Sequence, residues 1–106
     1  MMAEWIDVAP AEELEPGSWK TIEYDDRIIA VFNLDGEFYA IEDICTHDGA
    51  ELTGGEIEGT EIICPRHGAR FDIITGEALT PPAYEDIDTF EVRVKDGMVQ
   101  VNVEPD

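Results

Sequence analysis

Short runs of β-branched and aromatic residues recur along the chain between turn-forming residues, a pattern that predicts strands rather than helices. Two pairs of runs each flank an Asp-Gly dipeptide: 27–33 and 37–41 around Asp35-Gly36, and 90–95 and 98–103 around Asp96-Gly97. Asp and Gly both tolerate the positive φ that a type I′ turn requires, so each pair predicts a β-hairpin. Further strands are expected over 5–8, 19–24, 61–63 and 71–74, with at most one helical turn over 10–14.

The stretch between the two hairpins lacks this regularity and is rich in glycine: Gly49, Gly54, Gly55, Gly59, Gly68 and Gly76. It ends in Thr80-Pro81-Pro82-Ala83, where two proline rings impose a stiff, extended backbone. An irregular segment of this length is usually functional or disordered, and the short strand patterns inside it argue against disorder. We therefore expect functional loops over about 43–83.

The length of 106 residues and a hydrophobic content of 43% suit one small core. No linker or internal repeat divides the chain. The sequence predicts a single all-β domain over residues 1–106.

The net charge of −20 limits the possible partners. Residues 1–53 carry 14 acids against 2 bases and residues 54–106 carry 12 against 4, so the acidity is spread over the whole molecule. Such a charge repels phosphate backbones and anionic lipids, which argues against nucleic-acid and membrane binding. The absence of a leader pattern or a long apolar run predicts a cytoplasmic protein, where cysteines remain reduced.

All cysteines and histidines of the chain fall into two short motifs, Cys45-Thr46-His47 and Cys64-Pro65-Arg66-His67. Each motif supplies one thiolate and one imidazole from a tight turn. This donor set suits zinc, an iron–sulfur cluster or copper.

Three other interpretations explain the four residues less well. Isolated cysteines and histidines are often plain core or surface residues, but that does not explain why all four gather in two motifs. A nucleophilic Cys–His enzyme needs only one of each and leaves the second pair unexplained. A zinc-stabilised interaction module has the right ligand count, although zinc fingers normally group cysteines with cysteines and histidines with histidines.

The motifs resemble the signature of Rieske-type iron–sulfur proteins, Cys-x-His followed at a distance by Cys-x-x-His. Here the two boxes read Cys45-Thr46-His47-Asp48-Gly49-Ala50 and Cys64-Pro65-Arg66-His67-Gly68. Phe71-Asp72, Gly76 and Pro81-Pro82 also resemble the family's cluster-binding region. The flanking strands resemble its base domain, so the likeness covers nearly the whole chain.

The resemblance implies a small antiparallel β-sandwich with an inserted subdomain of two ligand loops. One [2Fe–2S] cluster per chain is then held by Cys45 and Cys64 on one iron and by His47 and His67 on the other. The implied function is that of a monomeric one-electron carrier, with no catalysis of its own, between a flavin-dependent ferredoxin reductase and a terminal oxygenase such as an aromatic-ring dioxygenase. The alternative within this fold is an electron-transfer small subunit of another redox enzyme, similar to that of nitrite reductase. A redox sensor is a third interpretation.

Departures from the high-potential branch of the family place the chain in the low-potential branch. The high-potential members have two disulfide-forming cysteines, where this sequence has Ala50 and Arg66. They also have Ser and Tyr hydroxyls near the cluster, where this sequence has Ala69 and Phe71. Fewer hydrogen bonds to sulfur and a strongly negative protein both disfavour an added electron.

Two expectations concern the surface around the ligands. Asp43, Asp48 and Glu51 are expected at a docking rim, and Arg66 and Arg70 are expected to offset repulsion there and to contact partners. Pro81 and Pro82 are expected to cover the cluster.

Overall fold

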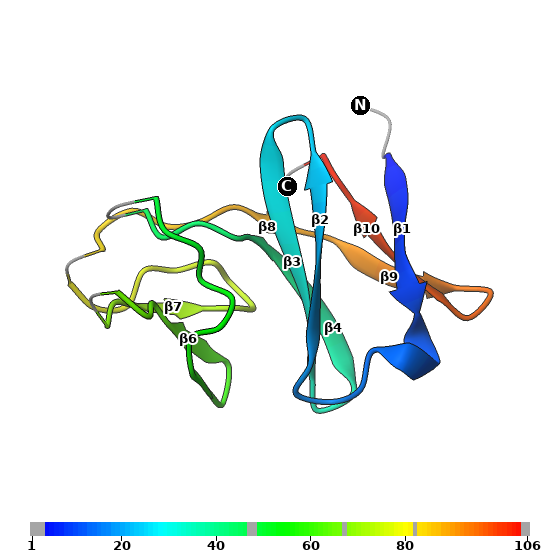
Figure 1. Cartoon of the computed structure of the whole chain (residues 1–106), viewed down its shortest axis with the longest axis horizontal. Helices are drawn as coiled ribbons and strands as arrows, with labels where there is room; N and C mark the ends of the chain where they lie inside the picture. The colour runs from blue at the N-terminus through cyan, green and yellow to red at the C-terminus, as the bar shows by residue number, and fades with distance from the viewer. Residues whose placement is uncertain (1–3, 47–48, 67, 82, 105–106) are drawn as a thin grey trace.

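The computed structural model describes residues 4–46, 49–66, 68–81 and 83–104. Over these ranges the chain forms β-strands and one turn of 3₁₀ helix (Figure 1), which confirms the all-β prediction. In chain order the elements are β1 (Trp5–Pro10), η1 (Ala11–Glu13), β2 (Trp19–Tyr24), β3 (Arg27–Leu34), β4 (Glu37–Glu42), β5 (Ile57–Glu58), β6 (Glu61–Ile63), β7 (Arg70–Asp72), β8 (Thr89–Phe90), β9 (Val92–Lys95) and β10 (Met98–Asn102). Among the described residues, no helix is long and apolar enough to cross a membrane.

The strands form three antiparallel sheets, in the orders β1-β10-β9, β2-β3-β4-β8 and β5-β6-β7. The first two sheets make up a sandwich, which we call the base. The third sheet and its flanking loops, residues 43–88, form what we call the lobe. Figure 1 shows the lobe at one end of the molecule, with β6 and β7 set apart from the base strands.

Both predicted Asp-Gly hairpin turns are confirmed. Asp35 and Gly36 have φ of 59° and 95°, and Asp96 and Gly97 have φ of 53° and 78°, as a type I′ turn requires. A third turn of this kind joins β2 to β3 through Asp25 (φ 51°) and Asp26 (φ 65°). The sequence pattern did not single this turn out, because Asp-Asp lacks the glycine that marks the other two.

The continuous strand predicted over 90–95 is wrong. Phe90 pairs with Ala40 in the four-stranded sheet, whereas Val92 pairs with Val101 in the other base sheet. The chain therefore crosses between the sheets at Glu91, and only the second part belongs to the hairpin. The short strand β5 was also not predicted, since two residues are too few to show a period.

Strand β3 is buried on both of its faces. Ile29 and Val31 pack into the core between the two base sheets, while the alternate residues Ala30 and Phe32 pack into the core of the lobe. The four-stranded sheet therefore acts as a wall shared by two cores. A strand buried on both faces has a continuous apolar run rather than an alternating one, as β3 does.

The lobe leaves the base and returns to it at neighbouring strands. The backbone N–H of Glu42, at the end of β4, donates to the carbonyl of Asp88, just before β8, at 3.0 Å. Arg27 reinforces this junction: its guanidinium contacts the Glu42 carboxylate at 3.0 and 3.2 Å and also pairs with the Asp88 carboxylate. The hydrogen bond to Glu42 contributes most to raising the pKa of Arg27 above its ordinary value, and the hydrogen bond to Asp88 raises it further.

Candidate metal centre

The two predicted ligand loops have the same backbone hydrogen-bond frame. In the first loop, the N–H of Cys45 donates to the Ala50 carbonyl at 2.7 Å, and the N–H of Gly49 donates to the Cys45 carbonyl at 2.7 Å. The second loop repeats both bonds at the same spacing: Cys64 to Ala69 at 2.7 Å and Gly68 to Cys64 at 3.0 Å. Each cysteine is thus fixed by both of its own backbone polar groups.

The glycine in each loop is needed for the backbone. Gly49 has φ of +78° and Gly68 has φ of +75°, a region that residues with a side chain rarely adopt. An added Cβ would meet no protein atom of the described residues within 4 Å at either position. The positive φ alone therefore accounts for a glycine in each loop.

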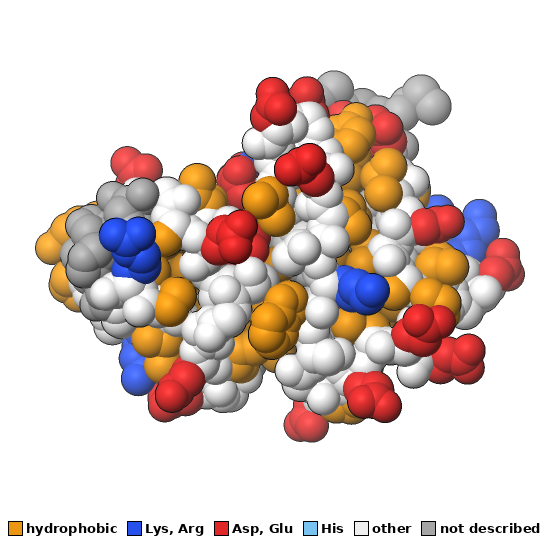
Figure 2. Space-filling view, in the orientation of Figure 1, with side chains coloured by type: hydrophobic (Ala, Val, Ile, Leu, Met, Phe, Trp, Pro, Cys, Tyr) orange, Lys and Arg blue, Asp and Glu red, His pale blue; other side chains and the backbone are white. Residues whose placement is uncertain are grey.

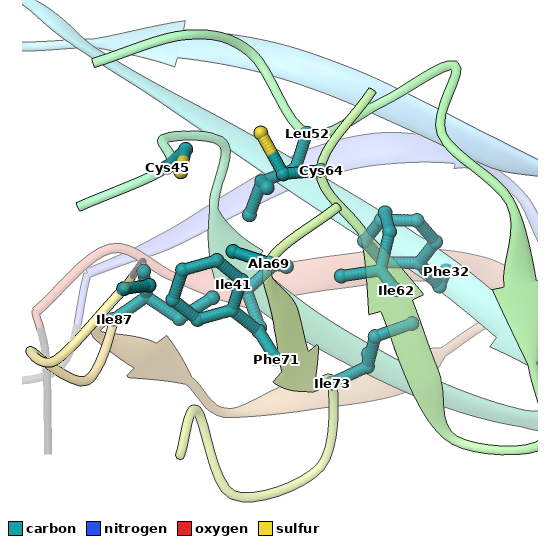
Figure 3. Packing of buried hydrophobic residues seen from close by; sticks show 12 residues of the cluster. Phe32, Ile41, Cys45, Leu52, Ile62, Cys64, Ala69, Phe71, Ile73 and Ile87 are labelled. Carbon is teal, nitrogen blue, oxygen red and sulfur yellow. The ribbon is translucent and has the colours of Figure 1, made fainter. Parts of the chain in front are cut away.

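Both cysteines are buried at one end of the lobe core. Cys45 is 0% and Cys64 is 1% exposed, and Figure 3 shows the two at the same end of the apolar cluster, above Ala69 and Phe71. The other two predicted ligands, His47 and His67, lie outside the described residues. Two buried thiols on matching loops suit a thiolate-bound metal centre, because a thiolate in apolar surroundings needs a cation beside it.

The second loop is the connection of a β-hairpin. Strand β6 runs directly into Cys64, and Ile63 pairs with Arg70 on the far side of the loop. Arg70 also ties β7 to the other two strands of this sheet, since its Nη1 lies 2.9 Å from the Glu58 carboxylate on β5 and 3.3 Å from the Glu61 carboxylate on β6. The hydrogen bonds of Arg70 to Glu58 and Glu61 raise its pKa, so this arginine, expected to contact partners, is already paired within the lobe.

Residues 51–56, which directly follow the first loop, form no strand, and the loop is held by the side chain of Asp43. Oδ1 accepts hydrogen bonds from the N–H groups of Leu52 (2.7 Å) and Thr53 (2.9 Å), and Oδ2 accepts one from the Thr53 hydroxyl (2.7 Å). Asp43 is 5% exposed, so its predicted place on a docking rim is wrong. Glu51 is exposed as that prediction needs, and Asp48 lies outside the described residues.

The proline-containing segment is tied to both loops. The Thr46 hydroxyl donates to the Glu85 carbonyl at 2.6 Å, and the N–H of Arg70 donates to the Thr80 hydroxyl at 3.0 Å. Pro81 is exposed, and Tyr84, at 81% exposure, is the most exposed of the large hydrophobic side chains described. Pro82 lies outside the described residues, so the expected cover over the cluster stays a prediction.

The positions that distinguish the two branches of the family differ in burial. Ala69 and Phe71 are fully buried beneath the cysteines, Ala50 is half-buried, and Arg66 is exposed. The side chains closest in sequence to the second cysteine and buried with it are therefore apolar and offer no hydroxyl donor.

A hollow of about 910 Å³ lies elsewhere, between the base and the lobe. Its lining includes Trp19, Tyr39 and Ile57, and neither cysteine contributes to it. The cysteine site is therefore distinct from this hollow.

Comparison with known proteins identifies the family of such a site. Residues 4–91 match the family described as "Rieske [2Fe-2S] domain". The chain is 36% identical over 104 residues to the ferredoxin component of the naphthalene 1,2-dioxygenase/salicylate 5-hydroxylase systems of a Ralstonia species, covering 98% of this chain and 100% of that one. It is 40% identical over 97 residues to the 3-phenylpropionate/cinnamic acid dioxygenase ferredoxin subunit of Photorhabdus laumondii, covering 91% of each chain.

The fold agrees with solved structures of the same kind. A chain in the complex of reduced oxygenase and oxidized ferredoxin of carbazole 1,9a-dioxygenase superposes with a TM-score of 0.91 at 36% identity, over 96% of this chain and 95% of that one. The predicted Rieske-like sandwich with an inserted lobe is therefore confirmed.

Proposed function

The chain belongs to the Rieske [2Fe–2S] domain family. From that membership we propose which residues bind its single cluster and which proteins exchange electrons with it. It is an electron-transfer protein of the type found as ferredoxin components, not an enzyme. In our proposal, Cys45 and Cys64 hold one iron of the cluster and His47 and His67 hold the other. The observation that carries the ligand set is the repeated hydrogen-bond frame around two buried cysteines.

The residues present suit the group. Two thiolates and two imidazoles leave the oxidised cluster neutral, whereas four thiolates would leave it doubly negative, which is why histidine ligands raise the potential. The bound cluster supplies the uptake and release of one electron. The protein keeps water away from the sulfur atoms through the buried side chains of Leu52, Ala69 and Phe71, and it fixes both cysteine backbones in advance.

The proposed partners are a flavin-dependent ferredoxin reductase and the terminal oxygenase of an aromatic-ring dioxygenase system, met in turn in the cytoplasm. The related ferredoxin in complex with its oxygenase supports this assignment. Figure 2 shows Asp and Glu side chains scattered over the base and the lobe, with few Lys or Arg among them. Such a surface attracts basic patches at long range and speeds a transient encounter.

We further propose that residues 1–106 act as a single domain and as a monomer. The radius of gyration of 13.0 Å is close to the roughly 13 Å of a compact 100-residue domain. A carrier that visits two partners needs weak, fast contacts with a single exposed surface rather than a permanent interface.

Metal analysis tests the cofactor and its ligands. Purified protein should contain about two iron atoms and two acid-labile sulfides per chain, and its reduced-state magnetic resonance signal should be shifted from that of a four-cysteine cluster. Anaerobic mixing of the reduced protein with an aromatic-ring terminal oxygenase should then reoxidise it by one electron per chain. Stoichiometric zinc without sulfide would contradict the cofactor, and a reduced protein that no such oxygenase reoxidises would contradict the proposed partner.

A further inference from the structure

Asp43 is a buried acid that the ligand set does not use. It lies two residues before Cys45, and only 5% of it is exposed, in a chain whose 26 acids are otherwise mainly at the surface. Its own backbone N–H donates to the Ile28 carbonyl on β3 at 2.8 Å, which anchors it to the base.

The carboxylate of Asp43 acts only as an acceptor. Two backbone N–H groups, of Leu52 and Thr53, point at Oδ1, and the Thr53 hydroxyl lies 2.7 Å from Oδ2. Hydrogen bonds to a charged acceptor are about twice as strong as neutral ones, so these three donors hold the carboxylate firmly in place. The structure thus provides a place for a fixed negative charge inside the protein.

We propose that Asp43 is a positioning residue with two effects: it closes the first ligand loop, and its buried charge lowers the reduction potential of the cluster. The inference rests on the proposed ligand set, since it needs Cys45 at the cluster.

The closing effect follows from where the bonds fall. Asp43 precedes the first ligand pair and Leu52 and Thr53 follow it, so the carboxylate joins the two ends of the segment that contains Cys45 and His47. The second loop obtains the same closure from the pairing of β6 with β7. Without the carboxylate, the N–H of fully buried Leu52 would lose this acceptor, which weakens the closure of the loop.

The electrostatic effect follows from burial. A charge in a low-dielectric interior is screened far less than one at the surface, where salt and water weaken it within roughly 8 Å at physiological ionic strength. A buried carboxylate therefore opposes an added electron more than an exposed acid at the same distance does.

The substitution Asp43→Asn separates the two effects. The amide oxygen still accepts from both N–H groups and the amide nitrogen donates to the Thr53 hydroxyl, so the loop stays closed while the charge disappears. Asp72→Asn is the matched control, because Asp72 Oδ1 accepts from the N–H groups of Ile74 (2.8 Å) and Thr75 (3.3 Å) in a similar but more exposed arrangement. We expect a positive shift of the potential in Asp43→Asn that clearly exceeds the shift in Asp72→Asn.

The substitution Thr53→Val tests the same carboxylate from the other side. It removes the hydroxyl donor and leaves the charge less neutralised, so the potential should shift negatively, and the cluster should bleach roughly tenfold faster in the presence of a chelator. Shifts of the same sign in Asp43→Asn and Thr53→Val, or no shift in either, would overturn the electrostatic effect. Wild-type bleaching in both Thr53→Val and Asp43→Ala would overturn the closing effect.

A parallel Cys45→Ser variant keeps this inference apart from the proposed function. If Cys45→Ser still holds an intact Rieske cluster, the ligand set is wrong and the inference falls with it. If Cys45→Ser loses the cluster while the Asp43 and Thr53 variants match the wild type in potential and bleaching, only the inference about Asp43 is wrong.

Discussion

The two ligand loops have the same backbone frame but are stabilised in different ways. The second loop is the connection of a hairpin, with Cys64 and Ala69 directly following and preceding paired strand residues. The first loop follows β4 and is closed by one carboxylate, that of Asp43. The two halves of the proposed metal site therefore have the same local geometry, although one depends on a sheet and the other on a single side chain.

Removal of a thiolate from either loop should have the largest effect. Cys45→Ser and Cys64→Ser should each abolish stable cluster assembly, because a serine hydroxyl does not replace a thiolate on ferric iron. Iron and sulfide analysis of each purified variant measures this. A variant that retained about two irons and two sulfides per chain would show that its loop does not supply a ligand.

The glycines test whether the two frames are energetically alike. Gly49→Ala and Gly68→Ala should each cost about 1–2 kcal/mol, because the positive φ strains a residue with a Cβ while the space around it is open. Denaturant unfolding followed by the cluster's absorption compares them. A much larger loss for Gly49→Ala would show that closure by a carboxylate tolerates strain less well than closure by a hairpin.

Hydroxyl groups beneath the second loop should change the potential without changing the fold. The wild-type potential should be about −150 mV, the low end of the Rieske range. Ala69→Ser and Phe71→Tyr should raise it, since a hydroxyl that donates to sulfur stabilises the reduced cluster. Ala50→Ser is the matched change in the first loop, and half-buried Ala50 should give the smaller rise.

Voltammetry on protein films measures all of these potentials. A wild-type value well above zero would contradict the assignment to the low-potential branch. A rise for Ala50→Ser as large as that for Ala69→Ser would show that the loops contribute equally to the potential.

The loops also differ in surface charge, and this should give the smallest effect. Exposed Glu51 follows the first loop, whereas exposed Arg66 lies in the second. Glu51→Gln should slow reduction by the reductase at low salt more than it changes the potential, and Glu12→Gln in η1, at the far end of the base, is the control. Stopped-flow rates across a salt series should fall as salt rises; rates that stay flat would show that docking depends on apolar contacts instead.

Most of the base could be predicted from local sequence, because its strands show their period within a few residues. The hairpin of β3 and β4 follows from two apolar runs around Asp35-Gly36. The transfer of Phe90 to a different sheet from Val92 could not be predicted, since both fit one alternating pattern and the difference lies in long-range pairing.

The proposed ligands were visible in the sequence, whereas the residues that support them were not. Two Cys–His motifs are visible in the sequence because they contain every cysteine and histidine of the chain. Asp43 is one acid among 26, and only the positions of Leu52 and Thr53 in space reveal that it is buried. Its proximity to Cys45 in sequence was visible, but that alone favoured a surface position.

The lobe begins and ends at a single point of the base, since Glu42 and Asp88 are hydrogen-bonded neighbours on β4 and before β8. In engineering terms, residues 43–88 form a cassette that needs only one pair of adjacent antiparallel strands as its attachment. A recipient sheet must also present an apolar patch equivalent to Ala30, Phe32 and Ile41, because the lobe core is completed by the outer face of the base. A transplant that supplied the strand pair without this patch would leave the core beneath the cysteines open to water.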